Sequence, residues 1–186
     1  MKLLGQLIDQ LDTSSDKSAE LIIKKLVKFG PKAVDELIVS ANNKSKPRIR
    51  KWSLQALGAI GDRRAAPLLK AALADERMTV KLHAIRGLVR MNFKAASKNI
   101  TKLLNDPSGG IRVNAIDALV ALKTKTAGPA IVKLLTDENW YIRQHAVRAC
   151  HELQIKKAVP HLKKMQKYDK RAAVLKELEI ALQKLD

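Results

Sequence analysis

Apolar and polar residues follow one another along this chain in a pattern that repeats every 31 residues. The repeat is marked by aliphatic–basic pairs, which are Ile49-Arg50, Val80-Lys81, Ile111-Arg112 and Ile142-Arg143. Apolar or small side chains recur three, four, seven and ten positions after each basic residue, and together with the aliphatic residue they lie on one face of a helix. The pattern therefore predicts a series of helices, each with a buried face.

A second, shorter apolar pattern precedes each of these helices and predicts a partner helix. Pro67, Pro129 and Pro160 share a position near its start, where the missing N–H of proline costs little. Aspartates recur in the turn between the two helices, where we expect them to cap the following helix: Asp75, Asp106 and Asp137. Six such units account for all 186 residues. Since one pair cannot bury its own apolar face, we expect an all-α, right-handed α-solenoid of six antiparallel helix pairs, forming a single domain over residues 1–186.

These units resemble the HEAT-like repeats of phycobilin lyases, which carry a proline in the first helix, an aspartate in the turn and an aliphatic–Arg pair in the second helix. Pro129, Asp137, Ile142 and Arg143 match that pattern, whereas Lys98 stands at the proline position of another unit. The resemblance implies that the second helices line a concave face and that turn aspartates pair with the basic residues of the repeat in a ladder. Such scaffolds serve many functions, so the resemblance implies the fold more than the function.

Composition narrows the class of protein further. The formal net charge is +18, 46% of the residues are hydrophobic, only 3% are aromatic, and there is one cysteine. This mixture favours helices and excludes a disulfide framework. Because no apolar run has the length of a membrane span, we expect a cytoplasmic protein without a membrane partner, with a monomer as the default state.

The concave face is the first candidate surface. Its predicted exposed stripe consists of Trp52, His83, Arg86, Arg90, Asn114, His145 and Arg148. Trp52 could stack on a base or on a partner side chain, or it could be buried under the loop at residues 44–50. Asp117 and Arg148 are one repeat apart and predict an ion pair.

Catalytic and metal chemistry find little support in the sequence. His83 and His145 are two repeats apart, which at the usual spacing of packed helices separates them by about 20 Å. Cys150 replaces a core leucine, so we expect a buried, inert thiol. A His-Glu pair, which the HEAT-like di-iron enzyme deoxyhypusine hydroxylase repeats, occurs here once, as His151 and Glu152. We therefore predict no metal, no cofactor and no catalytic residue.

A basic rim is the second candidate surface. Cations recur in the turns that join one helix pair to the next: Lys32, Arg63, Arg64, Lys94, Lys123, Lys125, Lys156 and Lys157. Five of them are in strict register at the N-terminal ends of first helices, namely Lys32, Arg63, Lys94, Lys125 and Lys156. The helix macrodipole disfavours cations there, so local stability does not explain these five. A row of cations one repeat apart suits a polyanion, although a generally lysine-rich surface would give the same composition.

The function that we expect is a non-catalytic binding scaffold whose basic rim engages an anionic macromolecule, with nucleic acid or a ribonucleoprotein as the first choice. One alternative is a protein–protein adaptor that uses the concave face. Another is a HEAT-like DNA alkyl-purine glycosylase, which would need an aromatic cleft around a catalytic carboxylate. The neighbours of Asp117 are instead Val113, Asn114, Ala118 and Val120, which departs from that pattern.

Overall fold

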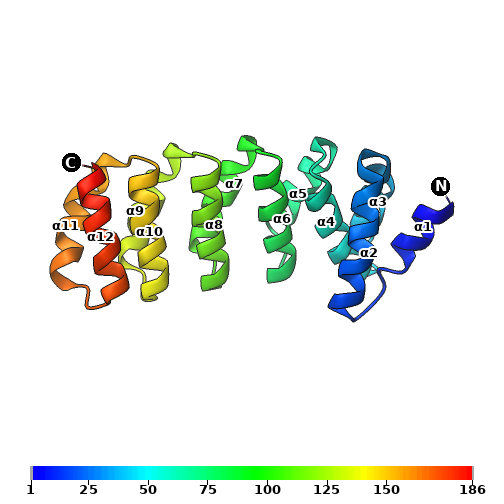
Figure 1. Cartoon of the computed structure of the whole chain (residues 1–186), viewed down its shortest axis with the longest axis horizontal. Coiled ribbons are helices and arrows are strands. Elements are labelled where there is room, and N and C mark those ends of the chain that lie inside the picture. Colours follow the sequence, from blue (N-terminus) through cyan, green and yellow to red (C-terminus); the bar gives the residue numbers. More distant parts are fainter. Residues whose placement is uncertain (1, 186) are drawn as a thin grey trace. The chain divides into compact units, whose positions relative to one another are not determined.

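The computed structural model describes residues 2–185, which form helices and turns without any strand. They divide between Phe93 and Lys94 into two compact units, which we call the N-terminal unit and the C-terminal unit. Each unit contains three helix pairs, so the six pairs that the 31-residue repeat predicts are confirmed (Figure 1).

The N-terminal unit pairs α1 with α2, α3 with α4 and α5 with α6. Its helices are α1 (Lys2–Asp9), α2 (Asp16–Phe29), α3 (Val34–Asn42), α4 (Pro47–Ile60), α5 (Ala66–Ala72) and α6 (Met78–Arg90). Short 3₁₀ turns, Gly30–Ala33 and Arg63–Ala65, lead into α3 and α5. The second helix of each pair packs on the second helix of the next, α2 on α4 and α4 on α6, so these three helices form one layer.

The C-terminal unit repeats this arrangement. Its helices are α7 (Ser97–Lys102), α8 (Gly109–Ala121), α9 (Gly128–Lys133), α10 (Trp140–Glu152), α11 (Val159–Tyr168) and α12 (Ala172–Leu185). The 3₁₀ turns are Lys94–Ala96, Leu103–Asn105, Lys125–Ala127, Leu134–Thr136 and Lys156–Ala158. Figure 1 shows α8, α10 and α12 side by side in front of α7, α9 and α11, and α10 packs against both α8 and α12.

The predicted apolar faces form the core of each unit. The aliphatic residues of the marker pairs are buried, with at most 3% exposure: Ile49, Val80, Ile111 and Ile142. The three prolines occupy the first positions of α5, α9 and α11, as the sequence predicts. Between α4 and α6 the backbones approach closely, because a Cβ added to Gly87 would lie 2.8 Å from Gly58 Cα. Glycine at both positions permits this packing.

One backbone conformation also follows the repeat. The residue that ends each turn after a second helix has a positive φ: Gly30, Gly61, Asn92, Lys123 and Gln154, each 31 residues after the last. This left-handed residue terminates the helix and lets its amide reach back to a carbonyl of the last turn, as Gly61 N does to Leu57 O at 3.0 Å. The first five helix pairs therefore share a residue of positive φ after their second helix, although only two of these residues are glycine.

Candidate functional site

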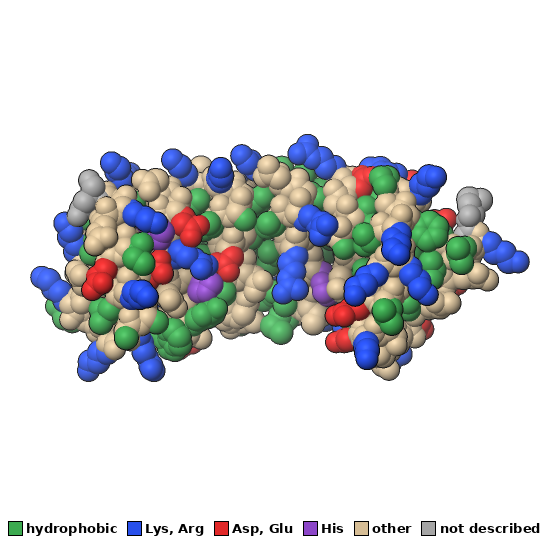
Figure 2. Space-filling view, in the orientation of Figure 1, with side chains coloured by type: hydrophobic (Ala, Val, Ile, Leu, Met, Phe, Trp, Pro, Cys, Tyr) green, Lys and Arg blue, Asp and Glu red, His purple; other side chains and the backbone are tan. Residues whose placement is uncertain are grey.

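The basic rim of the C-terminal unit lies on one edge of that unit. Lys94, Lys123, Lys125, Lys156 and Lys157 are all exposed and belong to the turns that precede α7, α9 and α11. Neighbouring turns touch, because Ser97 Oγ lies 2.8 Å from Thr124 Oγ1 and a Cβ added to Gly128 would lie 3.2 Å from Ile155. Figure 2 shows lysine and arginine side chains along this upper edge.

These five lysines make no ion pair with any residue between positions 2 and 185 that the structure describes. They stand on turns that are one helix spacing apart, about 8–10 Å. This edge of the C-terminal unit therefore presents unneutralised positive charge.

The basic rim of the N-terminal unit is shorter and partly neutralised. Lys32 and Arg63 are exposed on the turns before α3 and α5. Arg64 instead binds the carboxylates of Asp35 and Asp62, each at 2.9 Å, and donates to the Pro31 carbonyl oxygen at 2.6 Å. Arg64 thus ties two turns together, which makes it a structural residue as well as a surface cation.

The opposite edge of each unit carries the aspartate ladder. The basic residue of one pair binds the turn aspartate of the next pair: Arg50 binds Asp75, Arg112 binds Asp137 at 3.0 Å, and Arg143 binds Asp169 at 2.7 Å. These side chains are largely buried, so the prediction that the column of basic residues is structural is confirmed for these three pairs. Although burial raises the pKa of Asp169, its hydrogen bond from Arg143 lowers that pKa overall.

The predicted role of the turn aspartates as helix caps is wrong in detail. Asp75 Oδ1 accepts from Arg77 N at 3.0 Å, and Asp137 Oδ1 accepts from Asn139 N at 2.9 Å, in each case two residues ahead in the turn. Asn139 itself caps α10, by accepting from Tyr141 N at 2.9 Å. The aspartates therefore shape the turn and bind an arginine, which leaves the first amides of the helix to other residues.

The stripe on the second helices is less exposed than predicted in the N-terminal unit. Of the two alternatives for Trp52, a stacking surface or burial, the structure shows burial, because only 5% of this residue is exposed. Its Nε1 lies 3.5 Å from the Thr13 carbonyl oxygen, the Lys51 ammonium lies 3.6 Å from its ring centroid, and the His83 ring lies 6.3 Å away. The turn before α2 therefore covers the indole, rather than the loop at residues 44–50, and Trp52 offers no stacking surface. Arg86 and Arg90 are exposed.

Within the described residues, no charged side chain forms an ion pair with His83. Burial, together with the neighbouring cations Arg86 and Lys51, lowers the pKa of His83 to about 4. The imidazole is thus neutral at physiological pH, which suits a packed position better than an anion-binding one.

In the C-terminal unit the same stripe forms a compact polar cluster. Asp117 Oδ1 lies 2.7 Å from Arg148 Nη2 and 2.8 Å from His145 Nδ1, so the predicted ion pair is confirmed. Hydrogen bonds from His145 and the charge of Arg148 lower the pKa of Asp117 against the opposing effect of burial. His145 is only 8% exposed, which corrects its predicted place on the surface, and its ring packs on Tyr141 at 4.6 Å. Asn114 donates to the Gly110 carbonyl oxygen.

Two further reactive side chains of α10, Cys150 and His151, are buried. Cys150 is fully buried, and burial raises the pKa of its thiol to about 12. His151 Nε2 lies 3.0 Å from Glu177 Oε1, in a contact that joins α10 to α12. Within residues 2–185, no group of three His, Cys, Asp or Glu side chains is placed to hold a metal ion. Over the same residues, no helix has both the length and the apolar character that crossing a bilayer requires.

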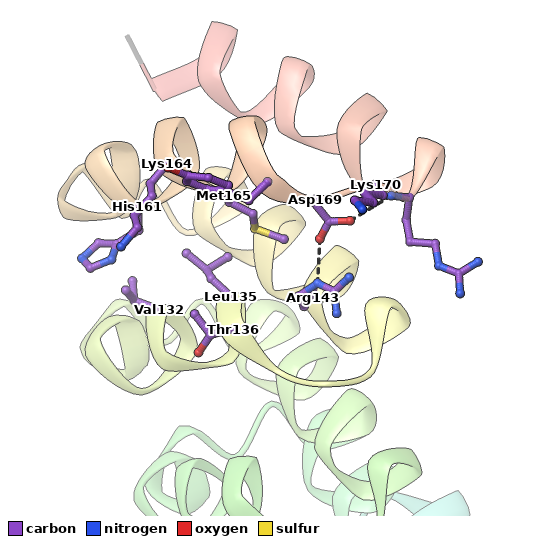
Figure 3. A pocket seen from close by; sticks show the side chains of 11 residues that line it. Val132, Leu135, Thr136, Arg143, His161, Lys164, Met165, Asp169 and Lys170 are labelled. Carbon is purple, nitrogen blue, oxygen red and sulfur yellow. Dashed lines mark hydrogen bonds and ion pairs between the residues drawn. The ribbon is translucent and has the colours of Figure 1, made fainter.

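A pocket in the C-terminal unit is not foreseen by the sequence pattern. It has a volume of about 500 Å³ and lies between α11 and the Leu134–Thr136 turn (Figure 3). Sequence reasoning missed it because the residues that line it, such as Leu135 and Met165, are read as ordinary core positions. One signal was present, since Asp169 follows Asp137 by one residue more than the repeat length.

Comparisons with known proteins agree on the fold. HEAT repeats match residues 4–89, 66–129 and 98–183. The bilin biosynthesis protein RpcF of Synechococcus sp. (strain WH8020) is 36% identical over 87 residues, which are 46% of this chain and 41% of that protein. The match thus spans less than half the length of this relative.

Solved structures show the same architecture. The complex of CpcE and CpcF of phycocyanin lyase from Nostoc sp. PCC7120 gives a TM-score of 0.63 at 18% identity, covering 98% of this chain and 94% of that chain. A designed armadillo repeat protein in complex with the peptide (KR)4 gives 0.65 at 18% identity, covering 98% and 99%. At these identities the likeness shows the fold, an α-solenoid of repeats suited to binding.

Proposed function

Because this chain belongs to the HEAT repeat family, whose members provide repeat surfaces for binding, we propose that it is a non-catalytic scaffold that binds an anionic macromolecule along its basic rim. The observation that carries the proposal is the set of exposed, unpaired lysines on one edge of the C-terminal unit. Nucleic acid is the partner that this chemistry favours first, since lysines on neighbouring turns suit a repeating phosphate backbone.

The surroundings of the rim support this choice over a random lysine-rich surface. The arginines of the aspartate ladder are paired and largely buried, as Arg112 and Arg143 are. Lys94, Lys125 and Lys156 begin the turns that lead into α7, α9 and α11, where the macrodipole opposes them. Because folding stability does not require positive charge at these positions, a binding function accounts for it better.

The test uses a matched pair of variants that differ only in where the charge changes. The first reverses the C-terminal part of the rim by replacing Lys94, Lys123, Lys125, Lys156 and Lys157 with Glu. The second replaces five exposed lysines away from the rim, namely Lys98, Lys102, Lys133, Lys167 and Lys176. Each variant lowers the formal net charge by ten, from +18 to +8.

Binding to a fluorescent 20-base-pair DNA duplex and to a single-stranded RNA of equal length is measured by anisotropy in increasing salt. The native chain should bind, with an affinity that falls steeply between about 50 and 200 mM salt. The rim variant should lose most of this affinity, whereas the control variant keeps most of it. If both variants lose affinity equally, the charge acts only as a diffuse surface and the rim proposal fails.

A second candidate function follows from the relatives. RpcF is described as a bilin biosynthesis protein, and CpcE and CpcF form a complex in a phycocyanin lyase. We infer from these matches that the alternative function to test is a role in bilin biosynthesis, which this chain would perform together with a second HEAT-repeat subunit. Titration with phycocyanobilin, followed by visible absorbance, should show a saturable spectral change if this candidate is correct. A chain that binds nucleic acid through the rim and leaves the bilin spectrum unchanged would exclude it.

A further inference from the structure

The pocket between α11 and the Leu134–Thr136 turn combines an apolar floor with a basic border. Leu135 is 4% exposed at its base, and Val132 and Met165 face it from two neighbouring helices. Figure 3 shows these apolar side chains turned toward one another across the opening. The volume, about 500 Å³, is in the range of pockets that receive a bulky side chain or a small molecule.

The charges around this pocket are almost all positive. Lys164, Lys170 and Arg171 border it, whereas the carboxylate that it contains, Asp169, is already bound by Arg143 at 2.7 Å. Arg143 also donates through Nη1 to the Asp137 carbonyl oxygen at 2.9 Å. These contacts use Nε and Nη1 and leave the Nη2 donors for another acceptor. The pocket therefore offers several cationic donors and no unneutralised carboxylate.

Tyr168 adds an exposed aromatic surface at the same place. It is 71% exposed, which is unusual for a large apolar ring in a chain with so few aromatic residues. The repeat is longer by one residue here, and α11 continues without a break to Tyr168, whereas the equivalent part of the preceding pair is α9 followed by a 3₁₀ turn. The exposure of the Tyr168 ring thus arises from this local departure from the repeat, and the regular fold of the repeat does not account for it.

A second hollow, of about 600 Å³, lies near the aspartate ladder of the N-terminal unit and differs in character. Its walls are Ala71, Ala74 and charged side chains of both signs, which include Lys44, Glu76 and Arg77. Because it has no large apolar groups, that hollow does not fit an apolar side chain. An apolar floor beside cationic side chains therefore distinguishes the C-terminal pocket from this hollow.

We propose that this pocket binds an acidic peptide segment of a partner protein, with one leucine- or phenylalanine-sized side chain inserted against Leu135 and Met165 and flanking carboxylates bound by Lys164, Lys170 and Arg143. A nucleic acid backbone would satisfy the cations but leave the apolar floor in water, so a peptide fits the pocket better. The residues of α11 that line the pocket extend from His161 to Tyr168, and neither Lys156 nor Lys157 is among the lining residues, so the site does not depend on the basic rim.

The experiment observes the pocket directly through its methionine. The full chain is prepared with ¹³C-methyl methionine, and the Met165 resonance is assigned with a Met165→Leu variant. The probe is the peptide Ac-DEDLFED-NH2, and its control is Ac-DEDSSED-NH2, which has the same charge but no apolar side chain. The first peptide should shift the Met165 resonance in a saturable way and leave those of Met78 and Met91, in the other unit, in place.

Two charge reversals on the same helix give the matched control. Lys164 borders the pocket, whereas Lys167 is exposed on α11 and does not line it. Lys164→Glu should weaken the peptide by about tenfold, and Lys167→Glu by about twofold or less. The serine peptide should bind at least about tenfold more weakly than the leucine–phenylalanine peptide. Equal melting midpoints of the two variants confirm that both remain folded.

Several results would overturn the proposal. Equal binding of the two peptides, or equal effects of the two variants, would mean that charge alone attracts the probe. A Met165 shift caused by the DNA duplex would assign the pocket to nucleic acid instead. A shift that depends on protein concentration without peptide would assign it to a second copy of this chain.

Loss of DNA binding in the rim variant, with peptide binding intact, would show that the two sites are independent.

Discussion

At the scale of single residues, His83 is the clearest case of a titratable group held in its neutral form. The folded chain lowers its pKa from 6.5 to about 4, through burial and the charges of Arg86 and Lys51, with Asp16 opposing them. The unfolded chain therefore binds a proton more readily than the folded chain between these two pH values. Stability that is present above pH 6.5 must fall as the pH is lowered toward 4.

The prediction is that His83→Asn removes part of this pH dependence. Asparagine is the residue that the repeat itself places at the equivalent position, Asn114. Between about pH 6.5 and 4 the native chain should lose on the order of 1–3 kcal/mol more unfolding free energy than the variant does. Urea denaturation at several pH values measures the difference. Parallel curves for the two proteins would show that His83 titrates normally in the folded chain.

Lys123 illustrates a backbone cost at a single residue. Its φ is 54°, at the position where two other repeats have Gly30 and Gly61. A residue with a Cβ is disfavoured in this conformation by about 1–2 kcal/mol. Glycine removes this cost, but the larger entropy of glycine in the unfolded chain cancels part of the gain. We expect Lys123→Gly to raise the unfolding free energy by about 0.5–1 kcal/mol.

The control for this prediction is Lys123→Ala, which removes the same charge but keeps the Cβ. Thermal unfolding of both variants separates the two effects, because only the glycine variant relieves the backbone. If alanine stabilises the chain as much as glycine does, the gain comes from the lost positive charge and the backbone argument is wrong.

At the scale of helices and turns, the aspartate ladder connects neighbouring pairs within each unit. Arg112 on α8 reaches the turn before α10, where its Nε lies 3.0 Å from Asp137 Oδ2 and both side chains are largely buried. Asp137→Ala should lower the unfolding free energy by about 2–4 kcal/mol, because it leaves a buried guanidinium without its partner. Asp137→Asn should cost less, because the amide oxygen can still accept from Asn139 N. Chemical denaturation checks both, and equal small losses would mean that the ladder contributes little.

Much of the structure of the helices and turns could be predicted from the sequence, because it depends on residues within one repeat. The 31-residue period predicts the helix pairs, the buried faces and the arginine–aspartate pairing, which Arg50 and Asp75 form as expected. Trp52 could not be placed in this way. Its position on the helix wheel faces outward, but Thr13 in the preceding pair, Lys51 and His83 lie against its ring.

The same reason explains the other corrections to the candidate site. His145 is buried because Tyr141, one turn earlier on α10, packs on its ring and Asp117 from the neighbouring helix α8 lies against its nitrogen. The C-terminal pocket depends on one extra residue before Asp169, which changes how α11 ends. The 31-residue period predicts the helices themselves. It does not predict which side chains touch, nor the effect of one extra residue in a repeat.

At the scale of the whole molecule, the dominant quantity is charge. The formal net charge of +18 is divided equally between the two units. Asp75, Asp137 and Asp169 neutralise buried arginines, whereas the five rim lysines of the C-terminal unit have no acidic partner within the described residues. A surface of this kind repels itself, and the folded state brings these charges closer together than the unfolded chain does.

This repulsion gives a prediction for the native chain in the absence of any partner. Raising the salt concentration from about 20 to 200 mM screens exposed charges and should raise the melting midpoint by a few degrees. The buried ladder is screened much less, so its contribution remains. The variant that reverses the five rim lysines of the C-terminal unit should melt higher than the native chain at low salt and respond less to added salt. A melting midpoint that falls with salt would mean that surface ion pairs outweigh the repulsion, and the unpaired state of the rim lysines would then have to be abandoned together with the polyanion surface built on it.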